Sequence, residues 1–234
     1  MLEINNLTKK YGSFVALDRI SMTCKAGNIT VLLGENGAGK STTIKSIASL
    51  LRFRGTIKIC GYSNDSIEAK KCFAYVPEVP VLYESLTIKE HIEFISAAYE
   101  VDNGLEQAQQ YLKLFNLEEK LNKTTKELSK GMKQKLSMLL ALITNPKVLL
   151  VDEPLIGLDP NAIEDVLEIF KELRDQGVAI LISTHIIDIM EEIYDEAFIL
   201  KQGRILGDIS KATSEESLKD IFFRLNGAKN EGTE

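Results

Sequence analysis

Residues 34–42 read Gly34-Glu35-Asn36-Gly37-Ala38-Gly39-Lys40-Ser41-Thr42 and match the phosphate-loop pattern G-x-x-x-x-G-K-[ST]. An apolar run, 29–33, precedes them and a helix-like segment, 42–51, follows, which is the strand–loop–helix context that the pattern requires. Glycines let the backbone turn with positive φ and approach a phosphate, and successive N–H groups at the helix start bind the anion. We therefore predict a nucleoside triphosphate site rather than a glycine-rich surface loop, with Lys40 on the β- and γ-phosphates and the Ser41 hydroxyl on Mg²⁺.

A second motif follows a strongly apolar run. Residues 148–151 are all apolar and are followed by Asp152 and Glu153. Such a run predicts a central parallel strand buried on both faces, and open α/β sheets bind ligands at the carboxyl ends of these strands. Two acids after a strand are also compatible with a solvated loop. Because the chain carries a phosphate loop, we predict instead that Asp152 binds Mg²⁺, directly or through water, and that Glu153 polarises the attacking water.

The chain has two histidines. His185 follows the apolar run 178–182 and is therefore expected at the same sheet edge as Gly34 and Asp152. At that edge a contact to a γ-phosphate is a better interpretation than a position in the core. His91 falls on a helix-like segment, and we expect it to be exposed or half-buried.

Two helix starts carry polar signals. Ser129 stands at the N-cap position of a predicted helix that extends to about residue 143. Lysines occupy the first turns of this helix, where each cation opposes the helix dipole by about 0.3–1 kcal/mol. Either these long side chains extend into solvent or the helix start faces an anion. Further along, Asp159 and Pro160 predict the N-cap and the first position of another helix.

Composition and charge exclude several classes of protein. The net charge of -6 and the lack of a lysine or arginine run argue against a nucleic-acid binder. Cys24, Cys60 and Cys72 are odd in number and unrelated in spacing, so they indicate neither a zinc site nor a disulfide framework and are typical of a reducing compartment. We find no signal segment at the N-terminus and no apolar window long enough to cross a bilayer. We expect a cytosolic protein that reaches a membrane only through a partner.

The remaining pattern alternates between strands and helices, except in one region. Alternating or apolar runs predict strands at 2–7, 17–25, 29–33, 55–60, 72–76, 148–151, 178–182, 197–201 and 204–209. Residues 86–144 show only helical spacing without a flanking linker, which predicts a helical insertion, and a short helix, 214–225, and a polar tail, 226–234, follow later. We predict one α/β domain over 1–234, with a P-loop NTPase core of mainly parallel strands, an N-terminal antiparallel β subdomain and an inserted α-helical subdomain.

In order and spacing, these motifs resemble the ATP-binding subunit of ABC transporters over essentially the whole chain. The matching segments are the phosphate loop (Walker A), 148–153 (Walker B), Leu158-Asp159 (the D-loop), His185 (the switch histidine) and Leu128–Met132 (the signature). Tyr11 falls where that family stacks an aromatic ring on adenine, although a lone tyrosine beside a glycine is also an ordinary turn residue. Other phosphate-loop families lack the signature and the switch histidine together, so the combination is specific.

Two positions depart from the family pattern. Glu78 stands where the family commonly has a glutamine that senses Mg²⁺ and links the site to the membrane partner. A carboxylate can also bind the metal, but it adds negative charge near the phosphates. The signature reads Ser129-Lys130-Gly131-Met132, so Lys130 replaces a glycine and Met132 a glutamine. Ser129 and Gly131 keep a hydroxyl and a backbone N–H, and Lys130 either adds positive charge or points away.

The resemblance implies an Mg²⁺-dependent ATPase in which two subunits, identical or not, bind two ATP molecules head to tail. Each γ-phosphate would meet Lys40, Mg²⁺ and His185 of one chain and Ser129 and Gly131 of the other. The resemblance also implies a bacterial transporter with a separately encoded integral membrane permease. That permease would hold the subunit at the inner, cytoplasmic face of the cell membrane.

Several questions stay open at this point. The candidate docking surface for a permease comprises Val79, Val81, Leu82 and Tyr83, although burial against the helical region explains these apolar residues equally well. A soluble ABC ATPase acting on ribosomes or DNA is a second candidate, but such proteins usually carry two of these domains or a long coiled-coil insertion. A small-molecule kinase would need an acceptor site that we do not find. Co-purification with an integral membrane protein would separate the transporter from both alternatives.

Overall fold

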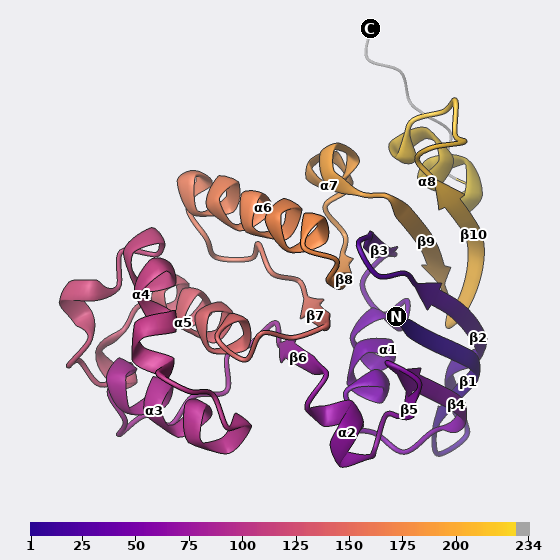
Figure 1. Cartoon of the computed structure of the whole chain (residues 1–234). Helices are drawn as coiled ribbons and strands as arrows, with labels where there is room; N and C mark the ends of the chain where they lie inside the picture. Colours follow the sequence, from indigo (N-terminus) through magenta and orange to yellow (C-terminus); the bar gives the residue numbers. More distant parts are fainter. Residues whose placement is uncertain (228–234) are drawn as a thin grey trace, which may run out of the picture.

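The computed structural model describes residues 1–227 and places a parallel sheet at the centre of the molecule (Figure 1). Its strand order is β10-β9-β3-β8-β7-β6. The strands span β3 (Ile29–Leu33), β6 (Phe73–Val76), β7 (Val148–Asp152), β8 (Ala179–Thr184), β9 (Glu196–Lys201) and β10 (Arg204–Ser210). Every neighbouring pair is parallel except β9 and β10. All residues of β3, β7 and β8 are buried, as expected for apolar central strands that are covered on both faces.

A separate antiparallel sheet has the order β2-β1-β4-β5. Its strands are β1 (Leu2–Tyr11), β2 (Phe14–Cys24), β4 (Arg54–Ile59) and β5 (Tyr62–Ser63). The strands predicted at 2–7 and 17–25 leave Lys10 and Tyr11 in the turn between them, and this is wrong. The β1–β2 ladder continues to the Tyr11–Phe14 pair, so both residues belong to β1 and only two residues form the turn.

Three helices form a lobe on one side of the parallel sheet, beside β6 and β7 in Figure 1. They are α3 (Ile88–Tyr99), α4 (Gly104–Leu114) and α5 (Lys130–Leu142), with two short 3₁₀ helices, η1 (Glu118–Lys120) and η2 (Thr125–Glu127), between α4 and α5. The start of α3 is fixed by a capping box, in which Thr87 and Glu90 each bind the backbone N–H of the other. His91 is only 3% exposed, so the expectation of an exposed or half-buried histidine is corrected: residues 88, 91 and 92 are the buried residues of this helix and share one face.

The other helices cover the two faces of the parallel sheet. They are α1 (Lys40–Ile47), α2 (Ile67–Lys70), α6 (Pro160–Asp175), α7 (Ile187–Ile193) and α8 (Leu218–Asn226). Helix α8 begins four residues later than the sequence pattern indicated, because Ser217 caps it by accepting a hydrogen bond from the Asp220 N–H. Asn226 ends α8, and residues 228–234 of the predicted polar tail lie outside the described residues.

The apolar core divides into two clusters, one on each face of the parallel sheet. One cluster contains Leu32 and Leu150 and packs the sheet against α1 and the antiparallel sheet. The other contains Val31 and Val151 and packs the opposite face against α6, α7, α8 and the helical lobe. Full burial of a side chain such as Leu or Phe contributes about 1.5–3 kcal/mol, so these clusters hold the sheet rigidly. The carboxyl ends of β3, β7 and β8 therefore meet at one fixed edge, where the polar residues of the next section lie.

Candidate nucleotide-binding site

The phosphate loop connects β3 to α1 and depends on a residue without a Cβ. Gly39 has φ of 113°, in the left-handed region, and a Cβ there would lie 2.7 Å from Leu17 Cδ2 and 3.1 Å from the Ala16 carbonyl oxygen. Another residue would therefore be both strained and crowded. Gly39 also occupies the N-cap position of α1, and no side chain caps that helix within the described residues. The loop thus presents the backbone N–H groups of a helix start, which is an anion-binding arrangement.

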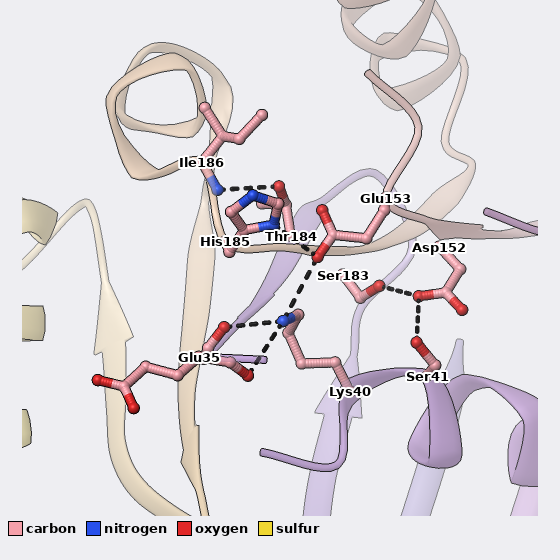
Figure 2. A network of polar contacts seen from close by, with 10 residues as sticks. Glu35, Lys40, Ser41, Asp152, Glu153, Ser183, Thr184, His185 and Ile186 are labelled. Atoms are coloured by element: carbon pink, nitrogen blue, oxygen red, sulfur yellow. Dashed lines mark hydrogen bonds and ion pairs between the residues drawn. The ribbon is translucent and has the colours of Figure 1, made fainter. Parts of the chain in front are cut away.

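Lys40 lies inside this loop. Its Nζ donates to the Gly34 carbonyl oxygen at 2.8 Å and to the Glu35 carbonyl oxygen at 3.4 Å, and it lies 3.4 Å from Glu153 Oε1 (Figure 2). The side chain is almost fully buried. Three oxygen atoms therefore hold an ammonium group that water scarcely reaches, and an incoming phosphate could replace them as its partner.

Glu153 links the phosphate loop to His185. It follows β7 with φ of 49°, a left-handed value that is uncommon for a residue with a side chain, and its N–H donates to the Ser183 carbonyl oxygen at 2.9 Å. Its Oε1 lies 3.0 Å from His185 Nδ1 as well as near Lys40, whereas its buried Oε2 has no hydrogen-bond partner within residues 1–227 (Figure 2). One carboxylate oxygen is thus fixed, and the other is available to a ligand or a water molecule.

Asp152, the last residue of β7, gathers two hydroxyl groups. Ser41 Oγ donates to Asp152 Oδ1 at 3.1 Å, and Ser183 Oγ donates to the same oxygen. Sequence reasoning paired Asp152 with Ser41 but missed Ser183, whose only signal was its position at the carboxyl end of an apolar run. Hydroxyl and carboxylate oxygens are hard ligands, and Mg²⁺ is usually held by one or two such groups together with water and phosphate oxygens. The Ser41–Asp152 pair therefore fits Mg²⁺.

A cavity of about 540 Å³ opens beside these residues, and we call it the nucleotide cavity. Residues of the phosphate loop line it together with Tyr11, Phe14, Glu78, Glu153 and His185. Tyr11 is 49% exposed and Phe14 is 64% exposed, and Lys9 Nζ lies 4.8 Å from the centroid of the Tyr11 ring. Phe14 was missed in the sequence, although it lies just across the turn from Tyr11. The cavity thus joins aromatic rings, which can stack on a base, to a cationic phosphate site.

The residues predicted for the signature do not line the nucleotide cavity of their own chain. Ser129 caps α5 by accepting the Met132 N–H at 3.3 Å, and both Ser129 and Lys130 are exposed. A Cβ at Gly131 would lie 2.9 Å from the Gly157 carbonyl oxygen, so this turn packs closely against the segment that follows Glu153. We call residues 129–132 the signature turn.

A second contact joins α5 to the start of α6. Asp159 caps α6 by accepting the Ala162 N–H at 3.0 Å, as the sequence predicts, and its other oxygen lies 3.3 Å from Lys135 Nζ. The Ala162 N–H and then the Lys135 ammonium lower the pKa of Asp159 below its ordinary value. Lys135 is thus the lysine of this helix that meets an anion, and that anion belongs to its own chain. The signature turn and the D-loop therefore form one connected surface.

Comparison with known proteins agrees with this geometry. Residues 17–156 match the family described as "ABC transporter". The chain belongs to the ABC transporter family. It is 37% identical to the ABC-type transporter ATP-binding protein EcsA of Bacillus subtilis (strain 168), over 94% of this chain and 92% of that protein. The ABC-family resemblance seen in the sequence is thereby confirmed.

Solved structures of ABC proteins share the fold. A structure titled as the ATP-binding subunit of an ABC transporter superposes with a TM-score of 0.91 at 35% identity, covering 97% of this chain and 99% of that one. The dimeric post-hydrolysis structure of the ATP-binding cassette MJ0796, bound to ADP and Pi, gives 0.81 at 26% identity and covers 90% and 98%. The predicted fold class and the predicted ABC ATPase are confirmed. Among the helices of residues 1–227, none has the length and apolar character needed to span a membrane.

Proposed function

We propose that this ABC subunit hydrolyses Mg²⁺-bound ATP in a head-to-tail pair and passes the energy to a membrane permease. The observation that carries the proposal is the separation of two half-sites on one chain. The nucleotide cavity holds Lys40, Glu153 and His185, whereas the signature turn lies outside that cavity. A second subunit, identical or different, would supply its signature turn to complete the site.

The residues of the nucleotide cavity have separable roles. The adenine would stack on Tyr11, and the loop 34–42 would bind the phosphates through its N–H groups. Lys40 would exchange its present partners, two carbonyl oxygens and Oε1 of Glu153, for the β- and γ-phosphates. Glu153 would then accept a proton from the attacking water, and His185 would orient the γ-phosphate. Mg²⁺, held by Ser41 and Asp152 with Glu78 nearby, would neutralise developing charge on the phosphates.

The signature turn can serve a partner's nucleotide without rearrangement. Ser129 Oγ accepts the Met132 N–H, so the proton of its hydroxyl remains free to donate to a phosphate oxygen. The Gly131 N–H lies in the first turn of α5, where the helix dipole favours an anion. Lys130 is exposed at the same turn and would add positive charge for the partner's γ-phosphate. The proposal therefore assigns all three residues to the ATP molecule of the second subunit.

The permease would bind at a second cavity, of about 640 Å³, that we call the docking groove. Its lining comes from the end of β6, the segment 77–82, α3 and α5, and includes Val79, Val81 and Leu82. Val81 is 87% exposed and Val79 and Tyr83 are also exposed, whereas Leu82 packs against the core. Three of the four apolar residues are therefore free to contact a partner, and Leu82 supports them from beneath.

The charge of the groove favours a cytoplasmic segment of a permease as its occupant. Two acids, Glu78 and Asp152, and one cation, Lys45, line the groove, which leaves one excess negative charge. Burial followed by the two negative charges raises the pKa of the Tyr75 hydroxyl. That hydroxyl has no hydrogen-bond partner within residues 1–227. Cytoplasmic loops of membrane proteins carry an excess of lysine and arginine, so a helix with apolar residues and one cation or hydrogen-bond donor fits the groove. Glu78 lines the nucleotide cavity as well, which gives the permease a direct route to the ATP site.

The proposal also covers the domain organisation of the chain and its location in the cell. The chain would act as a single ABC ATPase domain over 1–234, with the helical subdomain at about 86–144. It would lie at the cytoplasmic face of the cell membrane, held there by a separately encoded permease in a bacterium. We expect no nucleic-acid partner, because the net charge is -6 and no basic run is present.

The two-subunit site is tested with Glu153→Gln, which retains the shape of the side chain. Sedimentation of this variant with saturating ATP and Mg²⁺ is expected to show a dimer that dissociates when ATP is removed. Lys40→Ala in the same background is expected to stay monomeric because the nucleotide is lost, and Ser129→Ala is expected to weaken the dimer. A Glu153→Gln protein that binds ATP but remains monomeric at every accessible concentration would refute the head-to-tail site.

A further inference from the structure

His91 is a buried titratable residue that the ATP site does not use. It lies on α3, lines neither the nucleotide cavity nor the docking groove, and is 3% exposed. Its Nδ1 lies 2.8 Å from the Thr87 carbonyl oxygen, and its Nε2 lies 3.0 Å from the Tyr83 backbone nitrogen. Both ring nitrogens are therefore engaged, and one of them binds the segment that borders the docking groove.

These two contacts define the proton on the ring. A carbonyl oxygen only accepts, so Nδ1 must carry the proton that it donates to Thr87. A backbone N–H only donates, so Nε2 must be unprotonated to accept from Tyr83. The neutral ring with its proton on Nδ1 satisfies both contacts at once, and a ring with protons on both nitrogens would lose the contact to Tyr83.

Hydrogen bonds to the backbone of Tyr83 hold the segment that borders the groove. Within residues 1–227, no backbone hydrogen bond involves residues 79–82. Hydrogen bonds therefore hold this segment only at its two ends, at β6 and at Tyr83. The Tyr83 N–H is bound by His91, and its carbonyl oxygen accepts from the Thr125 hydroxyl at 2.8 Å and the Leu86 N–H at 3.1 Å. The peptide groups on both sides of Tyr83 Cα are therefore held by the helical lobe.

These hydrogen bonds affect the position of an exposed apolar surface that includes the Tyr83 ring. The exposed Tyr83 ring contacts the exposed Phe94 ring edge to face, with the ring centroids 5.6 Å apart. The centroid of the His91 ring lies 6.2 Å from that of Tyr83. Edge-to-face contact is a preferred arrangement of two aromatic rings, and the position of the Tyr83 backbone decides whether its ring can reach Phe94. One of the hydrogen bonds that hold the surface formed by Val79, Val81 and Tyr83 therefore goes to a buried imidazole.

We propose that His91 is a positioning residue for the permease: its neutral ring holds Tyr83, and with it the segment 79–83, in the shape that the permease binds. The inference rests on the proposed docking groove and adds to it the residue that keeps the groove's border in place. Affinity for the permease should then depend on a hydrogen-bond acceptor at the Nε2 position of residue 91.

Two conservative substitutions separate the contacts of the ring. In His91→Gln the amide oxygen reaches the place of Nε2 and can accept the Tyr83 N–H. In His91→Asn the shorter amide reaches only the place of Nδ1, so Thr87 keeps a donor and Tyr83 loses its acceptor. Thr125→Val loosens Tyr83 from its carbonyl side without changing His91, and it keeps the shape of the side chain.

Hydrogen exchange at the Tyr83 amide, measured on the isolated subunit, reports directly on the hydrogen bond from this amide to His91. Losing the partner of a partly buried N–H is expected to accelerate exchange at Tyr83 at least about fivefold in His91→Asn. His91→Gln is expected to exchange within about twofold of the original chain. Thermal unfolding of each variant, followed in parallel, separates local loosening from loss of the fold.

Docking is measured as saturable binding of the labelled subunit to inside-out membrane vesicles of the producing cells, stripped of peripheral proteins. Vesicles treated with trypsin are the control for a protein receptor. His91→Asn and Thr125→Val are expected to bind at least about fivefold more weakly, and His91→Gln within about twofold of the original chain. Rescue by glutamine, and not by asparagine, is a result that a merely structural role of the ring would not produce.

The possible outcomes distinguish this inference from the docking proposal. Absence of saturable, trypsin-sensitive binding by the original chain would refute docking itself. Normal binding by the original chain together with equally weak binding by the stable glutamine and asparagine variants would overturn the role of Nε2. So would a His91→Asn protein in which the Tyr83 amide exchanges faster but the affinity for vesicles is unchanged.

Discussion

Glu78 lines both the nucleotide cavity and the docking groove, yet the other residues that line the two regions differ in polarity. The cavity contains polar groups that contact one another, namely Lys40, Glu153 and His185. The groove is formed mainly by apolar side chains, with Glu78 and Asp152 among its few charged residues, and His91 lies outside it, bound to Tyr83 at its border. Of the two histidines of the chain, His185 lines the cavity, whereas His91 lies outside the groove and binds Tyr83 at its border. In our proposals His185 contacts the ligand directly, whereas His91 acts on the backbone that borders the groove.

The difference teaches how each region should respond to substitution. Groups that we propose to contact phosphate or water in the cavity would stabilise the transition state, so their loss should change the rate of hydrolysis by orders of magnitude. Groups that shape the groove would contribute to binding the proposed partner, so their loss should change affinity more modestly. The predictions below test this contrast, beginning with the largest expected effect.

Glu153→Gln should lower the rate of ATP hydrolysis by about 10²–10⁴-fold, because the amide cannot accept the proton of the attacking water. Binding of ATP should persist, since the phosphate loop is unchanged. The measurement is single-turnover hydrolysis of ATP by the purified subunit. Glu78→Gln is the matched control: it removes a carboxylate that also lines the nucleotide cavity but that we do not assign as the base. Equal losses in the two variants would contradict the assignment of Glu153.

Tyr11→Ala should weaken binding of ATP by about 5- to 150-fold, the range expected for removing one aromatic ring that stacks on a base. Tyr11→Phe should bind nearly normally because the ring is retained. Titration with a fluorescent ATP analogue in the Glu153→Gln background measures affinity without hydrolysis. If Phe14→Ala produced the larger loss, the base would stack on that ring instead, and the predicted role of Tyr11 would be wrong.

These first two predictions concern residues that were largely visible in the sequence. Lys40, Ser41, Asp152, Glu153 and His185 each follow an apolar run, and parallel strands bring their carboxyl ends to one edge whatever the rest of the chain does. Local spacing and one rule of topology were therefore sufficient to place them together. Their roles towards ATP and Mg²⁺ remain predictions.

The groove was less visible because its residues are assembled by tertiary packing. His91 stands three residues after Ile88 and one before Ile92, so its place on the apolar helix face was detectable. Its partners were not, since Tyr83 and Thr125 meet only when the segment before α3 packs against η2. The Lys135–Asp159 pair was missed for the same reason: 24 residues separate its partners, and no local pattern predicts their contact.

Val81→Asp should weaken binding to stripped inside-out vesicles by about tenfold or more, the loss typical of an important interface residue. Because Val81 is exposed, the unfolding temperature should change by no more than about 2 °C. Ile92→Asp is the contrasting variant: Ile92 is fully buried in α3, so a charge there should unfold the helical lobe. Unfolding by Val81→Asp would show that the exposed apolar residues belong to the core rather than to a docking surface.

The smallest expected effect is a pH dependence on the groove side of the molecule. Glu90 Oε2 accepts from the Thr87 N–H at 2.7 Å and from the Thr87 hydroxyl at 2.8 Å, and these bonds lower the pKa of Glu90 below its ordinary value. A carboxyl group with a lowered pKa in the folded state stabilises the fold above its unfolded pKa, of about 4.3, and loses this contribution as the pH falls through the folded value.

Glu90→Gln should therefore lower the unfolding temperature slightly at pH 7, and the difference from the original chain should shrink below about pH 4. Thermal unfolding between pH 3 and pH 7 measures this. Glu93→Gln is the matched control on the same helix, where the carboxylate makes a long contact of 3.7 Å to Lys89 and caps nothing. If the two variants followed the same pH profile, the capping box would not stabilise α3. The Thr87 carbonyl oxygen accepts a hydrogen bond from His91 Nδ1. In that case only the packing of Ile88 and Ile92 would hold this carbonyl in place.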